Sequence, residues 1–266
     1  MHVDLLLNET SALLSVLSPL GRLQVPTSRV STHVLSSWEE LESRAAEAAF
    51  DLAIVQPDFP GGNQCGKTNV GKIVRVRDAV GPGGLVHFVS EDGFRKGLLD
   101  DLHRLGCRFV IIQGTDDHPR SILRILSRAL TCRTVQARLL EDDPSGIIER
   151  RELLLASLVG WPPPGSVSDL ACRFHTSPRN LRRKMEAYGL LGPRQMIRWG
   201  CLLEVCALQR LGVKTRAHLA AILGVGDPTT LVRLCRDLTA LSPEEVLTEK
   251  YAKHLLDILV SQLKSA

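Results

Sequence analysis

The chain has 266 residues, of which 44% are hydrophobic and 23% charged, and this composition excludes a collagen-like, coiled-coil or wholly disordered protein. Its net charge of +4 is unevenly distributed, because residues 161–266 carry 15 basic and 9 acidic side chains while residues 1–160 carry 18 and 20. A basic second half is typical of proteins that bind a polyanion, most often nucleic acid, although a solvated basic surface would give the same count.

The sequence has no feature that predicts a membrane or an oxidising compartment. No run of about 18 apolar residues occurs, and the segment Met1–Asp4 lacks the basic region of a secretory leader. None of the seven cysteines forms a Cys-x-x-Cys pair, which argues against a disulfide framework or a zinc site. We therefore expect a cytoplasmic protein without a membrane partner, a metal or a cofactor.

Short apolar runs and amphipathic segments alternate through the first half of the chain. The apolar runs predict five strands, at Val3–Leu7, Val30–Leu35, Asp51–Val55, Leu85–Ser90 and Arg108–Gln113. The amphipathic segments predict helices at Ser11–Leu20, Trp38–Phe50, Val70–Val80 and Asp92–Leu105, and a long helix from Pro119 to Leu140. Five strands that are each followed by a helix predict an α/β domain over residues 1–140, with a parallel sheet covered on both faces.

Residues 141–146 combine acidic residues, Pro144 and Gly146, and this composition predicts a linker. The remainder, residues 147–266, shows helical spacing throughout and predicts an all-α domain. Its helices are expected at Ile147–Val159, Ser166–Phe174, Pro178–Tyr188, Arg194–Leu211, His218–Leu223, Pro228–Ala240 and Val246–Leu263. The expected fold class is therefore α/β plus all-α.

The segment Pro178–Tyr188 has the strongest functional pattern. Ser177 followed by Pro178 is typical of a helix N-cap and first turn, and Leu181 and Met185 mark a buried face. The other positions expose an amide and four cations, namely Arg179, Asn180, Arg182, Arg183 and Lys184. Arginine can bind a guanine edge with two hydrogen bonds, and both Lys and Arg hold phosphates, so this helix suits the major groove of DNA.

A weaker copy of this pattern follows it. The short helix at His218–Leu223 leads through Gly224–Gly226 to a helix capped by Asp227. That helix buries Leu231, Leu234 and Leu238 and exposes Thr229, Thr230, Arg233 and Arg236. Because two copies are in register, an all-helical packing domain with a solvated basic face is the less favoured interpretation.

The second half resembles the AraC/XylS family of transcription regulators, whose DNA-binding domain contains two helix-turn-helix units joined by a linker helix. The resemblance is carried by Leu170-Ala171, Ser177, Leu181, Arg183, Met185 and Pro193, and by Gly224, Leu231, Cys235, Ala240 and Ser242-Pro243. The usual aromatic residues of the family's second unit are Val225, Leu231 and Cys235 here. The resemblance implies double-stranded DNA as the partner, with base contacts from Arg179, Arg182 and Arg183 and from Thr229 and Arg233.

The first half resembles, in its order of elements, a flavodoxin-like response-regulator receiver. A receiver needs an acidic pair, an acceptor Asp, a hydroxyl and a Lys at the ends of successive strands. The corresponding residues are Asn8 and Glu9, Gln56, Ser90 and Gln113. Since Gln56 has no carboxylate to accept a phosphoryl group, we expect a pseudo-receiver that acts by forming a homodimer or by binding a protein or ligand.

Two alternatives to a DNA-binding regulator stay open. Residues Gly61–Thr68 fit the phosphate-binding pattern G-x-x-x-x-G-K-[ST] and predict a nucleotide-binding switch, although Pro57 and Pro60 interrupt the expected strand–loop connection. The other alternative is an interaction scaffold with a vestigial helix-turn-helix. No G-x-S-x-G nucleophile motif occurs, and we do not expect an enzyme.

Overall fold

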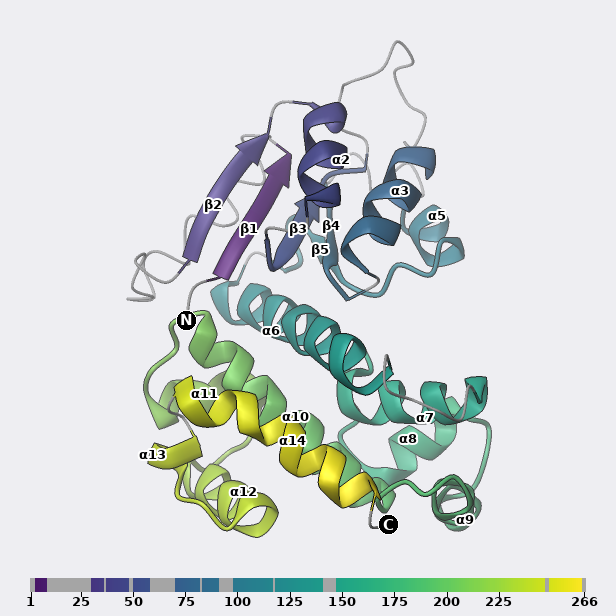
Figure 1. Cartoon of the computed structure of the whole chain (residues 1–266), viewed down its shortest axis with the longest axis vertical. Coiled ribbons are helices and arrows are strands. Elements are labelled where there is room, and N and C mark those ends of the chain that lie inside the picture. Colours follow the sequence, from purple (N-terminus) through teal and green to yellow (C-terminus); the bar gives the residue numbers. More distant parts are fainter. Residues whose placement is uncertain are drawn as a thin grey trace. The chain divides into compact units, whose positions relative to one another are not determined.

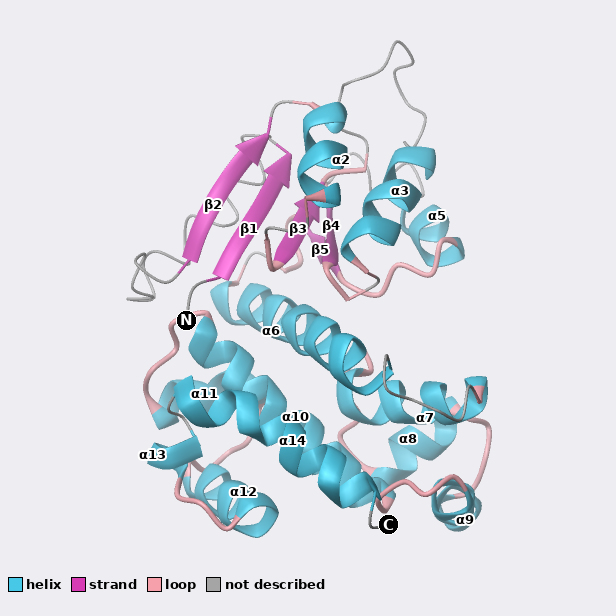
Figure 2. Cartoon of the chain, in the orientation of Figure 1, coloured by secondary structure: helices cyan, strands magenta, loops and turns pink. Residues whose placement is uncertain are grey.

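The structure is a computed structural model that describes residues 3–8, 30–35, 37–47, 50–57, 70–81, 83–90, 98–116, 118–140, 147–246 and 249–264. The chain divides into a first unit, Met1–Arg133 with Arg210–Val213, and a second unit, Thr134–Gln209 with Lys214–Ala266. Among the described residues, strands occur only in the first unit, so an α/β unit precedes a helical one (Figures 1 and 2). The division falls earlier than the predicted linker 141–146, which lies outside the described residues.

A five-stranded parallel sheet forms the centre of the first unit. In spatial order its strands are β2 (Val30–Leu35), β1 (Val3–Asn8), β3 (Leu52–Val55), β4 (Leu85–Val89) and β5 (Val110–Ile112). β1 pairs with β2 from Val3↔Val30 to Asn8↔Leu35, and β4 pairs with β5 from His87↔Val110 to Val89↔Ile112. The five predicted strands are confirmed, with ends that shift by at most two residues.

The described helices that follow these strands also agree with the sequence pattern, with one correction at the end of α2. They are α2 (Trp38–Ala46), α3 (Val70–Val80), α5 (Leu98–Arg104) and α6 (Pro119–Val135), and α6 continues into a π-helical turn, η2 (Gln136–Leu140). The prediction extended α2 to Phe50, but Phe50 is buried in the core beside β3 and lies outside the helix. The predicted helix at Ser11–Leu20 lies outside the described residues.

One face of the sheet packs against α2, α3 and α5, which lie on the same side of it (Figure 1). β3 and β4 are buried along their whole length, as expected of parallel strands covered on both faces. Alternate residues of these strands meet the buried faces of the three helices. The shared core comprises Ala53, Val55, Leu85 and Val89 from the sheet and Trp38, Leu41, Ile73, Val76, Leu98 and Leu102 from the helices.

A histidine, His87, occupies the middle of β4 and is buried. Its backbone N–H donates to the carbonyl of Phe109 at 2.8 Å, while its Nδ1 has no hydrogen-bond partner. Desolvation lowers the pKa of His87 to about 3, because the charged imidazolium is unfavourable in an apolar interior. His87 is therefore neutral at physiological pH and behaves as part of the apolar core.

The second unit contains eight described α-helices. They are α7 (Ile148–Val159), α8 (Val167–Arg173), α9 (Pro178–Ala187), α10 (Pro193–Arg210), α11 (Arg216–Leu223), α12 (Thr229–Thr239), α13 (Pro243–Val246) and α14 (Glu249–Lys264). α11 begins earlier than predicted because the Thr215 hydroxyl accepts a hydrogen bond from the His218 N–H at 3.2 Å and caps the helix. No described helix is both long enough and apolar enough to cross a membrane.

The predicted terminal helix Val246–Leu263 corresponds to α14, which begins at Glu249, and a short helix, α13, precedes it; residues 247–248 lie outside the described residues. Ser242 and Glu245 exchange side-chain to backbone hydrogen bonds of 2.8 and 3.3 Å, a capping box that begins α13 before Val246. Packing of the terminal helix onto the unit is confirmed, because Leu255 and Leu259 are buried. Gln262 of α14 accepts from the Trp199 indole N–H of α10 at 3.0 Å, and this contact joins the two helices.

Close packing of α10 against α7 should make Gly200 indispensable. A Cβ atom on Gly200 would lie 2.4 Å from the Leu158 carbonyl oxygen, closer than any real contact. We expect Gly200→Ala to lower the free energy of unfolding of the second unit by about 1–3 kcal/mol or more, as overpacking does. Gly192→Ala is the control in thermal and urea unfolding, since a Cβ there would meet nothing within 4 Å. Equal stability of the two variants would contradict this packing.

The buried His87 should make the first unit sensitive to acid. In the unfolded chain His87 has its ordinary pKa near 6.5, whereas its pKa in the folded protein is about 3, so the unfolded chain binds the extra proton. The stability that neutral His87 contributes is complete above pH 6.5 and decreases by about 1.4 kcal/mol per pH unit between pH 6.5 and 3.

His87→Leu should remove this share of the pH dependence, measured by urea unfolding at a series of pH values. The exposed His103, replaced by Gln, is the matched control. If the parent and His87→Leu lose stability with the same slope below pH 6.5, His87 does not carry the effect.

Candidate functional site

The second unit contains two pairs of helices with the same turn between their members. In the first pair, α8–α9, His175 adopts a left-handed backbone with φ 47°, and the Thr176 N–H donates to the Ala171 carbonyl at 3.1 Å. In the second pair, α11–α12, Gly224 has φ 72°, and the Val225 N–H donates to the Ala220 carbonyl at 3.0 Å. In each pair, the first helix is therefore followed by a residue with a left-handed backbone, and the N–H of the next residue donates to a carbonyl five positions earlier.

The buried positions of the two pairs correspond at a nearly constant sequence separation. Each of the following residues is buried in both copies: Leu170 and Leu219, Ala171 and Ala220, Leu181 and Leu231, Met185 and Cys235, Pro193 and Pro243, and Met196 and Val246. The separation is 49 in the first helix and 50 after the turn, since the second turn is one residue longer. The weaker copy expected from the sequence is thus a repeat of the packed framework.

α9 is held by its cap and its buried face, and it exposes the predicted basic residues. The Ser177 hydroxyl accepts from the Asn180 N–H at 3.2 Å, and Pro178 occupies the first turn. Leu181 and Met185 are buried as predicted, whereas Arg179, Asn180, Arg182 and Arg183 are exposed. Within the described part of the chain, none of these three arginines has an ion pair or a side-chain hydrogen bond.

Lys184 differs from the other cations of α9, because it turns toward α7. Its Nζ forms an ion pair with Glu149, which also accepts a hydrogen bond from the Tyr188 hydroxyl. The neighbouring Arg150 donates to the Tyr188 carbonyl at 3.0 Å. The hydrogen bond to Glu149 raises the pKa of Lys184, and the same bond together with that from Tyr188 lowers the pKa of Glu149. Lys184 is therefore engaged in fixing the end of α9.

α12 presents fewer available groups than α9. Thr229, Thr230, Arg233 and Arg236 are exposed, and Leu231, Leu234 and Leu238 are buried as predicted. Asp227 accepts from the Thr229 N–H at 2.8 Å and also from the Thr229 hydroxyl, so that hydroxyl already donates within the turn. These bonds lower the pKa of Asp227. Arg233 and Arg236 are the cations of α12, and no described side chain forms an ion pair or hydrogen bond with either.

Several other cations of the second unit form contacts within it, whereas Arg194 of α10 and Lys214 are exposed and have no ion pair or side-chain hydrogen bond with a described residue. Arg198 of α10 pairs with Asp237 of α12, and Arg216 of α11 pairs with Glu244 of α13 at 3.5 Å. Arg173 of α8 donates to the Pro162 carbonyl. The unpaired arginines are thus concentrated on the second helix of each pair.

Sequence reasoning missed one exposed residue on α9, Glu186. No ion pair or side-chain hydrogen bond in the described part of the structure involves it. It lies three residues after Arg183 and seven after Arg179, a spacing that places all three on one face of the helix. The sequence spacing alone places Glu186 on this face, but a pattern of cations does not include an acidic residue.

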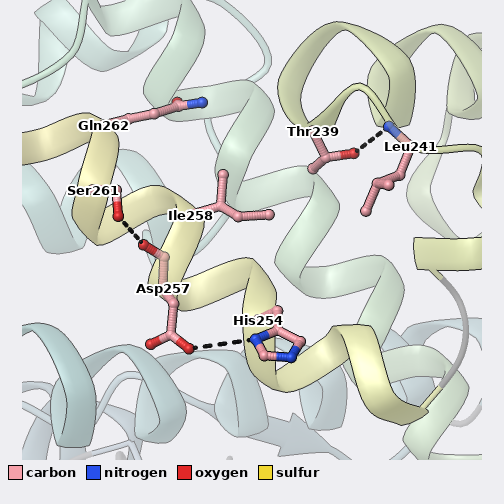
Figure 3. Close-up of a pocket in the computed structure, with 7 residues that line it drawn as sticks. All are labelled: Thr239, Leu241, His254, Asp257, Ile258, Ser261 and Gln262. Atoms are coloured by element: carbon pink, nitrogen blue, oxygen red, sulfur yellow. Dashed lines mark hydrogen bonds and ion pairs between the residues drawn. The ribbon is translucent and has the colours of Figure 1, made fainter.

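A hollow of about 590 Å³ lies between the end of α12 and α14 (Figure 3). It is lined by Thr239, Leu241, His254, Asp257, Ile258, Ser261 and Gln262. Asp257 is paired with His254 at 3.7 Å and with Arg138 at 3.0 Å, so its charge is already compensated. None of the predicted site residues lines this hollow.

In the first unit, Gln56, Ser90 and Gln113 directly follow β3, β4 and β5 and therefore lie at one edge of the sheet. The Gln113 N–H donates to the Val89 carbonyl at 3.0 Å, which places Gln113 beside Ser90. Gln56, which was expected from the sequence at the acceptor position of a pseudo-receiver, is buried. Asn8 ends β1, while Glu9 and the loop Gly61–Thr68 lie outside the described residues.

Comparison of the chain with protein-family models, curated proteins and solved structures finds no match. Among the residues that the structure describes, no group of three or more His, Cys, Asp or Glu could hold a metal ion. The repeated helix pairs and their exposed arginines are the features that distinguish this site.

Removing the charge of Glu149 should change the acidity of Tyr188. The hydrogen bond to Glu149 is the main cause of the raised pKa of Tyr188. We therefore expect Glu149→Gln to lower the pKa of Tyr188 toward its ordinary value, as measured by ultraviolet titration of tyrosinate. Tyr188→Phe identifies the transition among the two tyrosines, and the exposed Glu152→Gln is the charge-matched control. An unchanged pKa in Glu149→Gln would mean that this contact does not form in solution.

Proposed function

We propose that the chain is a sequence-specific DNA-binding transcription regulator. In this proposal α8–α9 and α11–α12 are tandem helix-turn-helix units of the AraC/XylS type, and α10 is the helix that joins them. The observation that carries the proposal is the exposed face of α9, where Arg179, Arg182 and Arg183 have no ion-pair or side-chain hydrogen-bond partner among the residues that the structure describes. Arginines that are left unpaired on a rigid helix favour a negatively charged ligand with defined geometry.

The chemistry and size of α9 support duplex DNA as that ligand. A helix of 10 residues is about 15 Å long, and the major groove, about 12 Å wide, admits a helix. Arginine pairs with guanine O6 and N7 through two hydrogen bonds, and an asparagine such as Asn180 can pair similarly with adenine. The Ser177 cap, the buried Leu181 and Met185, and the contact of Tyr188 with α7 hold the helix in one orientation.

The repeat of the packed framework supports a second contact through α12. Two units on one face of a duplex would meet successive major grooves about 34 Å apart. Arg233 and Arg236 would supply phosphate or base contacts there. Because Thr229 already donates to Asp227 and α12 has only two available cations, we propose that α12 contributes position more than base specificity.

For the first unit we propose a flavodoxin-like pseudo-receiver that modulates DNA binding. The strand order β2-β1-β3-β4-β5 and the polar residues at the ends of β3, β4 and β5 support this assignment. Gln56 at the acceptor position removes aspartyl phosphorylation as the switch. Self-association into a homodimer or binding of a protein or ligand would then carry the signal.

Selection of random duplex DNA on the purified chain, followed by sequencing, tests the proposed function. We expect enrichment of a motif with two elements about one helical turn apart. A single short element would restrict base reading to α9. Binding to any duplex without enrichment would reveal phosphate attraction alone and would contradict the proposal.

Substitutions on α9 should then show which of its side chains contact bases. Arg179→Ala with Arg183→Ala should reduce specific affinity by several kcal/mol, at about 1–3 kcal/mol for each lost base contact. Arg120→Ala is the control, because Arg120 is an exposed arginine of α6 outside the two helix pairs, and its loss should leave the selected motif unchanged. A double variant that binds the selected site as tightly as the parent would overturn the assignment of α9.

A further inference from the structure

The stripe of α9 that faces away from the core ends in a carboxylate. Arg179 and Arg183 each lie two residues from a buried position, Leu181 or Met185, which is about 200° around the helix. Glu186 continues this stripe one turn after Arg183 and is exposed. From Arg179 to Glu186 the stripe rises about 10 Å, or roughly three base-pair steps of 3.4 Å.

Glu186 has no role within the protein that its contacts reveal. It forms no ion pair or side-chain hydrogen bond with the described residues, in contrast to Glu149, which fixes Lys184 and Tyr188. Its counterpart in the second pair, fifty residues later, is Arg236. The central positions of the two stripes, Arg183 and Arg233, are the same residue. The two helix pairs therefore carry the same residue, an arginine, at the centre of the stripe. One turn later they carry opposite charges, Glu186 in α9 and Arg236 in α12.

From this placement we infer that Glu186 is a specificity-determining residue that selects cytosine in the DNA element read by α9. This inference rests on the proposed DNA-binding function. An ionised carboxylate only accepts hydrogen bonds, and the amino group N4 of cytosine is a major-groove donor without an acceptor on the same base edge. Guanine and thymine present the acceptors O6 and O4, whose lone pairs repel a carboxylate. In adenine the acceptor N7 lies beside the amino group and repels the carboxylate in the same way.

A carboxylate on this stripe also makes a phosphate contact unfavourable at that turn. If Glu186 met the DNA backbone, like charges would weaken binding to every sequence. If Glu186 meets a base edge, its negative charge reduces the binding free energy little at cytosine and more at the other bases. Such repulsion of the wrong bases creates specificity. The two placements therefore predict different results for the same substitution.

The test compares parent, Glu186→Ala, Glu186→Gln and Arg236→Glu in the random-duplex selection, followed by binding to the parent's selected site and its single-base variants. The exposed Glu152→Ala of α7 is the charge-matched control, because it makes the same change of charge on a helix outside the two helix pairs. Circular dichroism checks that each variant keeps its helix content.

We expect the parent to select cytosine at one position near the guanine that Arg183 reads. In Glu186→Ala the preference for cytosine at that position alone should fall on the order of tenfold, the rest of the motif being unchanged. Glu186→Gln, whose amide can also donate, should relax the same position. Arg236→Glu should weaken binding through the second element without adding a base preference, because α12 is proposed to contribute position more than base specificity, and Glu152→Ala should alter no position.

Three results would overturn the role of Glu186 while leaving the proposed function intact. They are an unchanged cytosine preference in Glu186→Ala, selection of another base, adenine included, at the position that responds, and an equal gain of affinity for all sequences. The last result would show that Glu186 repels phosphate. If the parent itself enriches no motif, the DNA-binding function has failed, and the inference fails with it.

Discussion

The second unit depends on the close approach of α10 to α7 at Gly200. A side chain there would collide with the Leu158 backbone, so the glycine allows two helices to meet with their main chains almost in contact. α10 then connects the two helix pairs, and Trp199, one residue before Gly200, joins it to α14 through Gln262. The position of the exposed face of α9 therefore follows from buried apolar packing together with the polar contacts that Glu149 and Arg150 of α7 make at the end of α9.

Charges in this unit fall into two groups that the sequence does not distinguish. Arg198, Arg216 and Lys184 are paired with carboxylates on neighbouring helices and hold those helices together. The arginines on the outward faces of α9 and α12 have no such partner in the described structure. Because exposed pairs contribute little to stability, the paired cations act chiefly in orientation, and the unpaired ones are available for a ligand. This separation supports the proposed DNA contact more specifically than net charge does.

The first unit combines a complete sheet with a changed set of polar groups at its edge. Five parallel strands bring Gln56, Ser90 and Gln113 together, as the sequence pattern predicts. Gln56 at this edge is buried, and its amide is not a nucleophile. In the proposed function, this unit passes on its signal through association instead of phosphoryl transfer. His87 in the centre of the same sheet adds a neutral group whose protonation would oppose folding in acid.

The sequence by itself determined the class of each half, the five strands and the buried stripes of α9 and α12, since these depend on local periodicity and capping. It also identified Ser177 and Pro178 as the start of α9. Only the tertiary structure decided which cations are available, because the pairing of Lys184 with Glu149 joins residues 35 positions apart. The end of α2 before the buried Phe50 and the absence of a described partner for Glu186 were decided in the same way. Packing and hydrogen bonds between distant segments override local propensity, and no pattern within one helix records them.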